Sequence, residues 1–137
     1  MGCNLSTKQI FLMNILHLST FDHLRGAKAS YRLHQHLILK GQNSVMLVDY
    51  KTETFTNVIQ LSYTRWQRIR KRIIKSLLYE FIFSQLKNCK YFSLDYNFTA
   101  LSANQILSQI PFKPDIICLH WVCDFLTPKL IYKLNKI

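Results

Sequence analysis

Glycine and proline are both scarce, with three residues of each in a chain of 137. This scarcity excludes collagen-like and low-complexity classes, and the sequence has no internal repeat in the solenoid range. No uninterrupted apolar run approaches the roughly 20 residues that a membrane-spanning helix needs. The amino terminus lacks the basic and long apolar segments of a secretory signal. With 49% hydrophobic residues, the chain has the length and composition of one folded domain.

Acidic residues are scarce as well: 7 of them oppose 18 lysines and arginines, which gives a formal net charge of +11. So large an excess favours anionic partners, namely phosphate-bearing ligands, an anionic membrane surface or nucleic acid. The charge alone does not choose among them. No recognised nucleic-acid-binding motif accompanies it, so a specific nucleic-acid partner is not expected.

The chain contains four cysteines at irregular spacing, Cys3, Cys89, Cys118 and Cys123. This spacing argues against a disulfide framework and indicates a reducing, cytoplasmic location. Cys118 and Cys123 flank His120, but a structural zinc site needs four ligands and usually contains a closely spaced cysteine pair. We therefore predict no metal site and no resident cofactor.

The first half of the chain has the pattern of a βαβ unit. Residues 9–18 are almost continuously apolar, which is typical of a strand buried on both faces of a parallel sheet. Residues 27–40 have apolar positions at helical spacing, and Gly41 is a plausible stop for this helix. Residues 44–48 form a second short apolar strand, so the crossover is expected to be right-handed.

The rest of the chain is expected to complete one α/β domain with a Rossmann-like parallel sheet and flanking helices. Residues 1–8 are interpreted as a loose tail and residues 9–137 as that domain. The remaining predicted elements are a loop over 49–63, a long helix over 64–88, a short helix from Ser102 to about 110, a buried strand over 115–122 and a last helix capped by Thr127, with Pro128 at its first position.

The polar turn over residues 19–26, between the first strand and the first helix, is the main candidate for a ligand site. Backbone N–H groups at a helix amino terminus bind anions or sugar hydroxyls, and α/β sheets bind ligands at the carboxyl ends of their strands. An ordinary connecting loop explains the pattern equally well. The predicted substrate-binding residues are Ser19, Thr20, Asp22, Arg25 and Gly26.

The histidines include a second candidate for a functional site. His120 lies late in a predicted strand, where it is placed to donate to a sugar hydroxyl or to transfer a proton. A hydrogen-bonded structural histidine is the alternative. His17, in the first strand, is interpreted as structural, and His34 and His36 are expected to be partly exposed on the first helix.

The predicted helix over 64–88 is basic and amphipathic. At about 100° per residue, Trp66 and the following Ile, Leu and Phe residues share one side. Three interpretations remain open: a core-packed helix with a solvated basic side, a membrane-surface helix beside anionic lipid, or a phosphate-neutralising nucleic-acid element. The predicted membrane-facing residues are Arg65, Trp66, Arg68, Lys71, Arg72 and Lys75.

The amino-terminal residues MGCNLS match the pattern for myristoylation at Gly2, with Cys3 as a candidate palmitoylation site. Two acyl chains would anchor a protein stably, whereas one would not. A chance match in a short tail is the alternative.

Two segments carry a family resemblance. Residues 14–48 read NILHLSTFDHLRGAKASYRLHQHLILKGQNSVMLV, and residues 113–134 read KPDIICLHWVCDFLTPKLIYKL. Their order and separation resemble the amino-terminal domain of family 4-like glycosyltransferases of the GT-B fold. Gly26 and the turn before it match that family's glycine-rich loop, which commonly has two or more glycines. His120 matches a strand-end histidine that faces the cleft, and is the expected catalytic residue.

The resemblance implies a retaining enzyme that moves a sugar from a nucleotide-sugar donor to a carbohydrate or lipid-linked acceptor, in polysaccharide or glycolipid synthesis. The family builds its cleft between two Rossmann-like domains, of which the amino-terminal one mainly binds the acceptor. The donor-binding domain is absent from these 137 residues, so a truncated or split product with little or no catalysis is expected. The competing interpretation is a non-catalytic protein held at a membrane by an acylated Gly2 and the basic helix.

Overall fold

The structure is a computed structural model that describes residues 12–23, 27–85, 101–122 and 125–136. The predicted tail over 1–8 and the acylation pattern at its start therefore lie outside the described residues. The described elements are β1 (Asn14–Phe21), α1 (Ala27–Leu39), β2 (Asn43–Tyr50), β3 (Val58–Gln60), α2 (Arg65–Gln85), α3 (Ala103–Leu107), β4 (Ile116–Leu119) and α4 (Pro128–Leu134).

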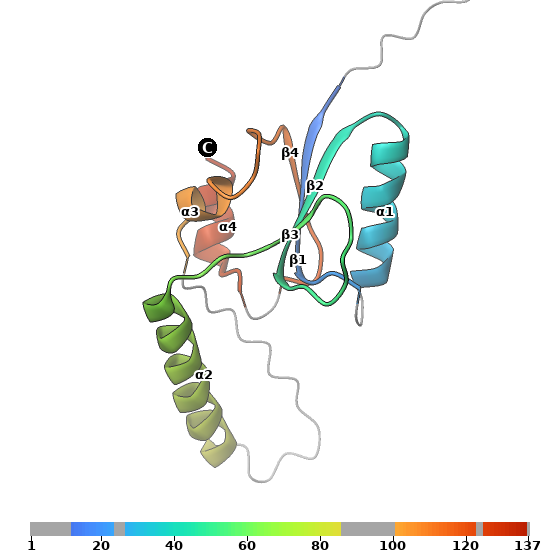
Figure 1. The fold of residues 1–137 in the computed structure, drawn as a ribbon. Helices are drawn as coiled ribbons and strands as arrows, with labels where there is room; N and C mark the ends of the chain where they lie inside the picture. Colours follow the sequence, from blue (N-terminus) through green and yellow to red (C-terminus); the bar gives the residue numbers. More distant parts are fainter. Residues whose placement is uncertain (1–11, 24–26, 86–100, 123–124, 137) are drawn as a thin grey trace, which may run out of the picture.

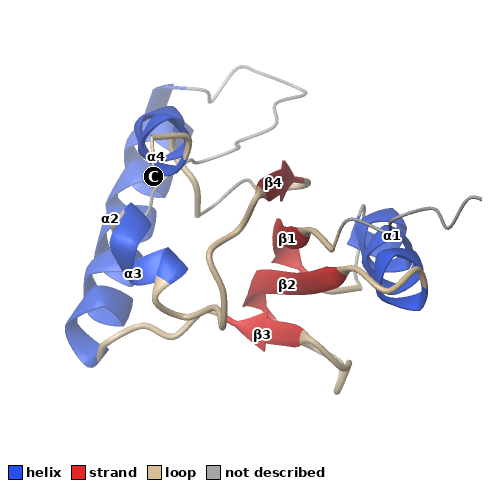
Figure 2. Ribbon diagram, turned by 90° about the horizontal axis from the view of Figure 1, so that it is seen from above, coloured by secondary structure: helices blue, strands red, loops and turns tan. Residues whose placement is uncertain are grey.

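The four strands form one parallel sheet in the order β3-β2-β1-β4. Helix α1 lies on one face of this sheet, and α2, α3 and α4 lie on the other (Figures 1 and 2). The predicted α/β class with a Rossmann-like parallel sheet is thus confirmed. Strand β1, one of the two interior strands of the sheet, pairs with both β2 and β4. This position explains why six consecutive residues of β1 are buried.

The two faces of the sheet are packed very differently. Alternate residues of a strand point to opposite faces, and Leu16, Leu18 and Leu47 join the large apolar core beneath α3 and α4. On the α1 side, the apolar cluster that the described residues form is smaller: its buried members are Met46, Val48 and Val58. Histidine and serine side chains fill much of the remaining space on that side, which creates the first candidate site.

Helix ends follow the local chemistry of the sequence. Ser102 and Gln105 form a capping box: the Ser102 hydroxyl accepts from the Gln105 amide, and the Gln105 side chain accepts from the Ser102 amide. Thr127 caps α4, with Pro128 in its first turn. Gly41 follows α1 with a φ of 77°, the left-handed conformation that glycine adopts readily. All three predicted boundaries are confirmed.

Two strand predictions were wrong. Residues 49–63 are not all loop, because Val58–Gln60 pairs in parallel with β2 as β3. Three residues are too few to show a strand period. Strand β4 was predicted as buried, yet Ile116 is 42% and Leu119 is 40% exposed, because in the described part of the chain β4 pairs with β1 alone and forms a sheet edge.

The central position of β1 predicts a large cost for removing a core side chain there. Leu16 is fully buried between the sheet and α3/α4. We expect Leu16→Ala to lower the free energy of unfolding by about 2–5 kcal/mol, through lost burial and the cavity left behind. The same substitution at the exposed Leu39 is the matched control and should cost less than about 0.5 kcal/mol. Urea unfolding measures both, and equal effects would contradict the assigned core.

Candidate functional site

The first candidate site lies where the strand order reverses. From β1 the chain proceeds to β2 and β3 on one side, whereas β4 is added on the other. The carboxyl ends of β1 and β4 therefore form the switch point at which α/β sheets bind ligands. The Thr20 amide donates to the Trp121 carbonyl at 2.6 Å, and the His120 amide donates to the Leu18 carbonyl at 3.0 Å. Thr20, one of the predicted substrate-binding residues, thus lies next to the end of β4 and His120.

His120 is paired with His17 at this point. Nδ1 of His17 and Nε2 of His120 are 2.9 Å apart, and the two rings are stacked with centroids 5.2 Å apart and planes 10° apart. One nitrogen must carry the hydrogen and the other must accept it. His34 completes the cluster: its ring lies edge-on to His17 at 5.6 Å, and its Nδ1 is 2.7 Å from the Ser44 hydroxyl oxygen.

Burial keeps these histidines uncharged. Desolvation, followed by repulsion from the other two rings, lowers the pKa of His17 to about 4. Desolvation also lowers the pKa of His34 and of His120. Near neutral pH the cluster therefore consists of neutral imidazoles, each able to both donate and accept a hydrogen bond. Such a group suits an uncharged hydroxyl better than an anion.

The sequence expectations for the other histidines have mixed outcomes. His17 is fully buried and hydrogen-bonded, as a structural histidine should be. His36 is exposed, as predicted. The prediction for His34 was wrong: its side chain is fully buried because it turns towards Ser44 and His17 beneath α1.

The predicted turn over 19–26 was wrong in its first part, because residues 19–21 belong to β1. Ser19 and Thr20 are buried, and within the described residues the Ser19 hydroxyl has no hydrogen-bond partner. Asp22 is also buried, and its carboxylate accepts from the Thr52 amide, the Thr52 hydroxyl and the Glu53 amide at 2.7–2.9 Å. Asp22 thus joins the turn after β1 to the loop after β2.

The Asp22 carboxylate is stabilised in its charged form. Burial by itself raises the pKa of this group, but the hydrogen bonds from Glu53 and Thr52 outweigh burial and lower the pKa. Arg25 and Gly26, the remaining predicted substrate-binding residues, lie outside the described residues.

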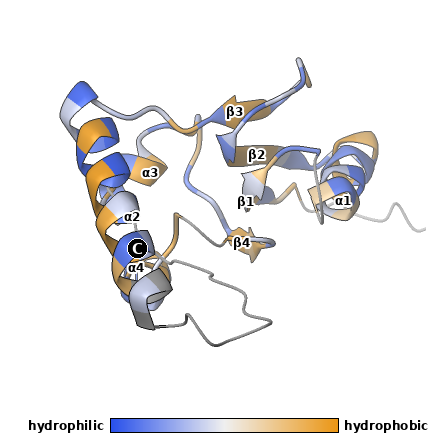
Figure 3. Ribbon diagram, turned by 90° about the horizontal axis from the view of Figure 1, so that it is seen from below, coloured by the Kyte–Doolittle hydropathy of each residue, from blue (hydrophilic) through white to orange (hydrophobic). Residues whose placement is uncertain are grey.

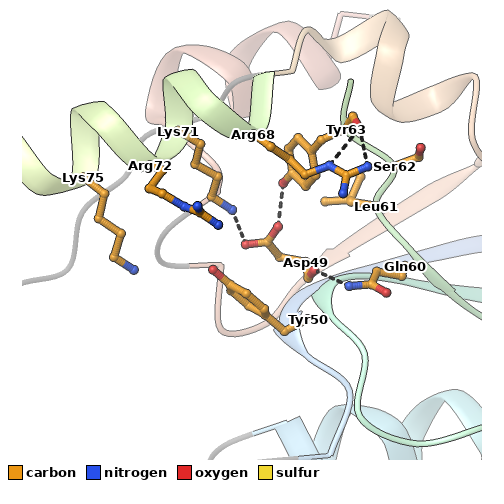
Figure 4. A pocket seen from close by; sticks show the side chains of 10 residues that line it. All are labelled: Asp49, Tyr50, Gln60, Leu61, Ser62, Tyr63, Arg68, Lys71, Arg72 and Lys75. Carbon is orange, nitrogen blue, oxygen red and sulfur yellow. Dashed lines mark hydrogen bonds and ion pairs between the residues drawn. The ribbon is translucent and has the colours of Figure 1, made fainter. Parts of the chain in front are cut away.

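A second polar cluster lies on the opposite face of the sheet, around Asp49 at the carboxyl end of β2 (Figure 4). The buried Asp49 carboxylate forms an ion pair with the Lys71 ammonium and accepts from the Tyr63 hydroxyl at 2.6 Å. Burial, and then the hydrogen bond to the Asp49 carboxylate, raise the pKa of Tyr63, so the hydroxyl remains a donor. Sequence reasoning missed Asp49, although an acid directly after a buried parallel strand is a detectable signal.

This cluster sets the orientation of α2. The Lys71 side chain is only 14% exposed and faces Asp49, which does not fit its expected membrane-facing position. Arg68 remains exposed, and its guanidinium donates twice to the carbonyl of Tyr63, just before the helix, at 3.3 Å. The apolar side points outward instead, with Trp66 80% and Phe81 64% exposed. The core-packed interpretation of this helix was therefore wrong.

Figure 3 shows hydrophobic and hydrophilic residues alternating along α2. Among the helices of the described segments, none combines the length and apolar character needed to cross a bilayer. Within those same segments, no group of three or more His, Cys, Asp or Glu residues is arranged to hold a metal ion.

No protein-family model matches the sequence, and comparisons with curated proteins and with solved structures give no match. The site must therefore be interpreted from its own geometry. That geometry offers a neutral histidine cluster at the switch point and a charged cluster across the sheet.

The histidine cluster predicts a pH dependence of stability. The folded pKa of His17 is about 4, below the ordinary value, so the unfolded chain binds the proton first. Stability is fully present above about pH 6.5 and is lost as the pH falls through the window down to about 4. We expect the free energy of unfolding to fall by about 1 kcal/mol between about pH 7 and about pH 5.

Urea unfolding at several pH values measures this slope. His36→Gln, which removes an exposed histidine from the same region, is the control and should leave the slope intact. The carboxylate of Asp22, with its lowered pKa, acts only at lower pH. Stability that stays constant down to about pH 5 would contradict a neutral His17 in the folded chain.

Proposed function

We propose that this chain is the amino-terminal, acceptor-side domain of a GT-B glycosyltransferase. The observation that carries the proposal is the position of His120, which lies beside the carboxyl end of β1 at the switch point of a parallel sheet. The resemblance of residues 14–48 and 113–134 to family 4-like glycosyltransferases supports the same assignment. The whole enzyme would transfer a sugar in polysaccharide or glycolipid synthesis.

His120 is the residue proposed to contact the acceptor. It is half-buried, and one of its ring nitrogens is held by His17, so the other nitrogen remains for a sugar hydroxyl. The neutral state of the ring allows it to accept a proton or to donate a hydrogen bond. His17 acts as a positioning residue, because its hydrogen bond fixes the tautomer and orientation of His120.

The nucleotide-sugar donor is assigned to a second domain that these residues do not include. The proposed contribution of this chain is therefore recognition of the acceptor and, through His120, orientation of its attacking hydroxyl. The proposal requires no metal ion. A sugar is largely uncharged, which fits the neutral histidines at the switch point.

Sugar binding tests this proposal directly. We expect simple methyl glycosides at millimolar concentration to shift the imidazole NMR signals of His120 and His17. UDP-glucose and GDP-mannose should not shift them beyond the effect of their sugars. His120→Ala should weaken glycoside binding about tenfold or more, since a buried hydrogen-bonding group is lost.

The exposed His36 on α1 provides the matched control, and His36→Ala should leave glycoside binding unchanged. Histidine signals that respond to no glycoside would refute the acceptor-side assignment. A response only to the nucleotide portion of the donors would do so as well, because it would place the donor on this domain.

A second candidate function is supported by the exposed apolar side of α2. Trp66, Leu77 and Phe81 project from this helix with most of their surface exposed. Aromatic residues beside cations are typical of helices that lie in the headgroup region of anionic membranes. The chain would then be a membrane-surface protein, either without catalysis or as a peripheral enzyme. Gly2, whose acylation would add to such binding, lies outside the described residues.

Vesicle flotation tests the membrane candidate. The chain should float with phosphatidylcholine vesicles that contain phosphatidylglycerol, and much less with phosphatidylcholine alone. Replacing both Trp66 and Phe81 by Ala should reduce the bound fraction about tenfold, because the buried apolar area is lost. Tyr132→Ala, which removes an exposed aromatic residue from α4, is the control. Flotation that ignores lipid charge and both substitutions would rule the candidate out.

A further inference from the structure

A cavity of about 660 Å³ lies between α2 and the carboxyl ends of β2 and β3. This volume falls within the range of small-molecule sites. Figure 4 shows ten lining residues, of which Asp49 is the one acid. Four cationic residues of α2 line the same cavity: Arg68, Lys71, Arg72 and Lys75.

The residues that line the cavity carry a net positive formal charge. Four cations and one carboxylate leave a formal charge of +3 on its lining. The Asp49 charge is already matched by the Lys71 ammonium. Arg68 donates to the Tyr63 carbonyl, a neutral acceptor that leaves the guanidinium charge in place. Among the described residues, Arg72 has no ion pair or hydrogen bond through its side chain.

The buried ion pair gives this cavity a fixed framework. Asp49 holds both the Lys71 ammonium and the Tyr63 hydroxyl, which ties α2 and the segment before it to the end of β2. The Lys71 ammonium also lies 4.9 Å from the centre of the Tyr63 ring and 5.3 Å from that of Tyr50. Lys71 is therefore held over the end of β2, while Arg68 and Arg72 remain exposed beside the cavity.

We propose that this cavity is a binding site for a phosphate-bearing ligand, with a diphosphate as the best-matched group. A guanidinium presents paired N–H donors that match phosphate oxygens, and Arg68 and Arg72 supply two such groups one helical turn apart. The volume exceeds what a phosphate alone would fill, and Tyr50 and Leu61 offer apolar surface for an attached group. The proposal does not depend on a role in sugar transfer.

Four of the six residues predicted to face a membrane line this cavity instead, so the site is distinct from the exposed apolar side of α2. At about 100° per residue, Arg72 and Lys75 lie on the side of α2 opposite Trp66 and Leu77. Anion binding at the cavity and apolar contact through the outer side are thus separate properties of one helix. The ligand's phosphate groups could come from a soluble compound or from a lipid headgroup, and the chemistry of recognition is the same.

Calorimetric titration with inorganic pyrophosphate tests the site. We expect saturable binding to a single site that weakens as salt is added. Arg72→Gln should weaken it about tenfold or more, because a charge-assisted bidentate contact is removed. Arg70→Gln is the matched control: it makes the same charge change on the same helix, outside the cavity lining. The dissociation constant of this variant should be unchanged.

A competition experiment identifies the source of the phosphate. If phosphatidic acid vesicles displace pyrophosphate and phosphatidylglycerol vesicles of equal charge do not, the ligand is a phosphomonoester headgroup. If neither displaces it, the site takes a soluble phosphate compound. Equal weakening by Arg70→Gln and Arg72→Gln would overturn the proposal, because it would show attraction to the overall charge of the chain. The absence of saturable pyrophosphate binding at low salt would overturn it too.

Discussion

The buried carboxylate of Asp49 determines how α2 and the segment before it lie against the sheet. An unpaired charge in such a position costs several kcal/mol, so the carboxylate requires the Lys71 ammonium and the Tyr63 hydroxyl. Lys71 belongs to the basic side of α2. Because Lys71 pairs with Asp49, the Lys71 side of α2 faces the end of β2, and Trp66 and Phe81 point outward. An amphipathic helix in a soluble domain usually has the reverse orientation.

On the α1 side of the sheet, polar groups are also buried, but they are uncharged and hydrogen-bonded rather than ion-paired. Polar side chains replace part of the apolar core there. The buried His17 is hydrogen-bonded to His120, and the buried His34 is hydrogen-bonded to Ser44. Burial also holds the histidines neutral, since a charged imidazole would lack solvent and would repel its neighbours. The hydrogen bond and ring stacking with the buried His17 hold the His120 ring in place at the switch point.

Local chemistry accounts for what the sequence could predict. The capping box at Ser102 and the glycine after α1 act through neighbouring residues, and both mark their helix boundaries correctly. The apolar run over 9–18 predicts a first strand but not its bounds, because β1 runs over Asn14–Phe21. The place of β4 beside the end of β1 depends on pairing between distant segments. Strand β3 is too short to show a period, and the burial of His34 depends on Ser44, which comes from another element. Neither could be predicted from local pattern.

The orientation of α2 shows why composition alone could not identify its role. Its cationic and apolar sides are clear in the sequence, but three interpretations remained open, because the partner of each side comes from elsewhere in the chain. Asp49 decides between the sides through a single ion pair. The net charge of +11 is not spread evenly over the surface, because four of the cationic residues line one cavity. The neutral histidines across the sheet suit hydroxyl groups, whereas this charged cavity suits phosphate, so the two proposed sites lie on opposite faces of the sheet.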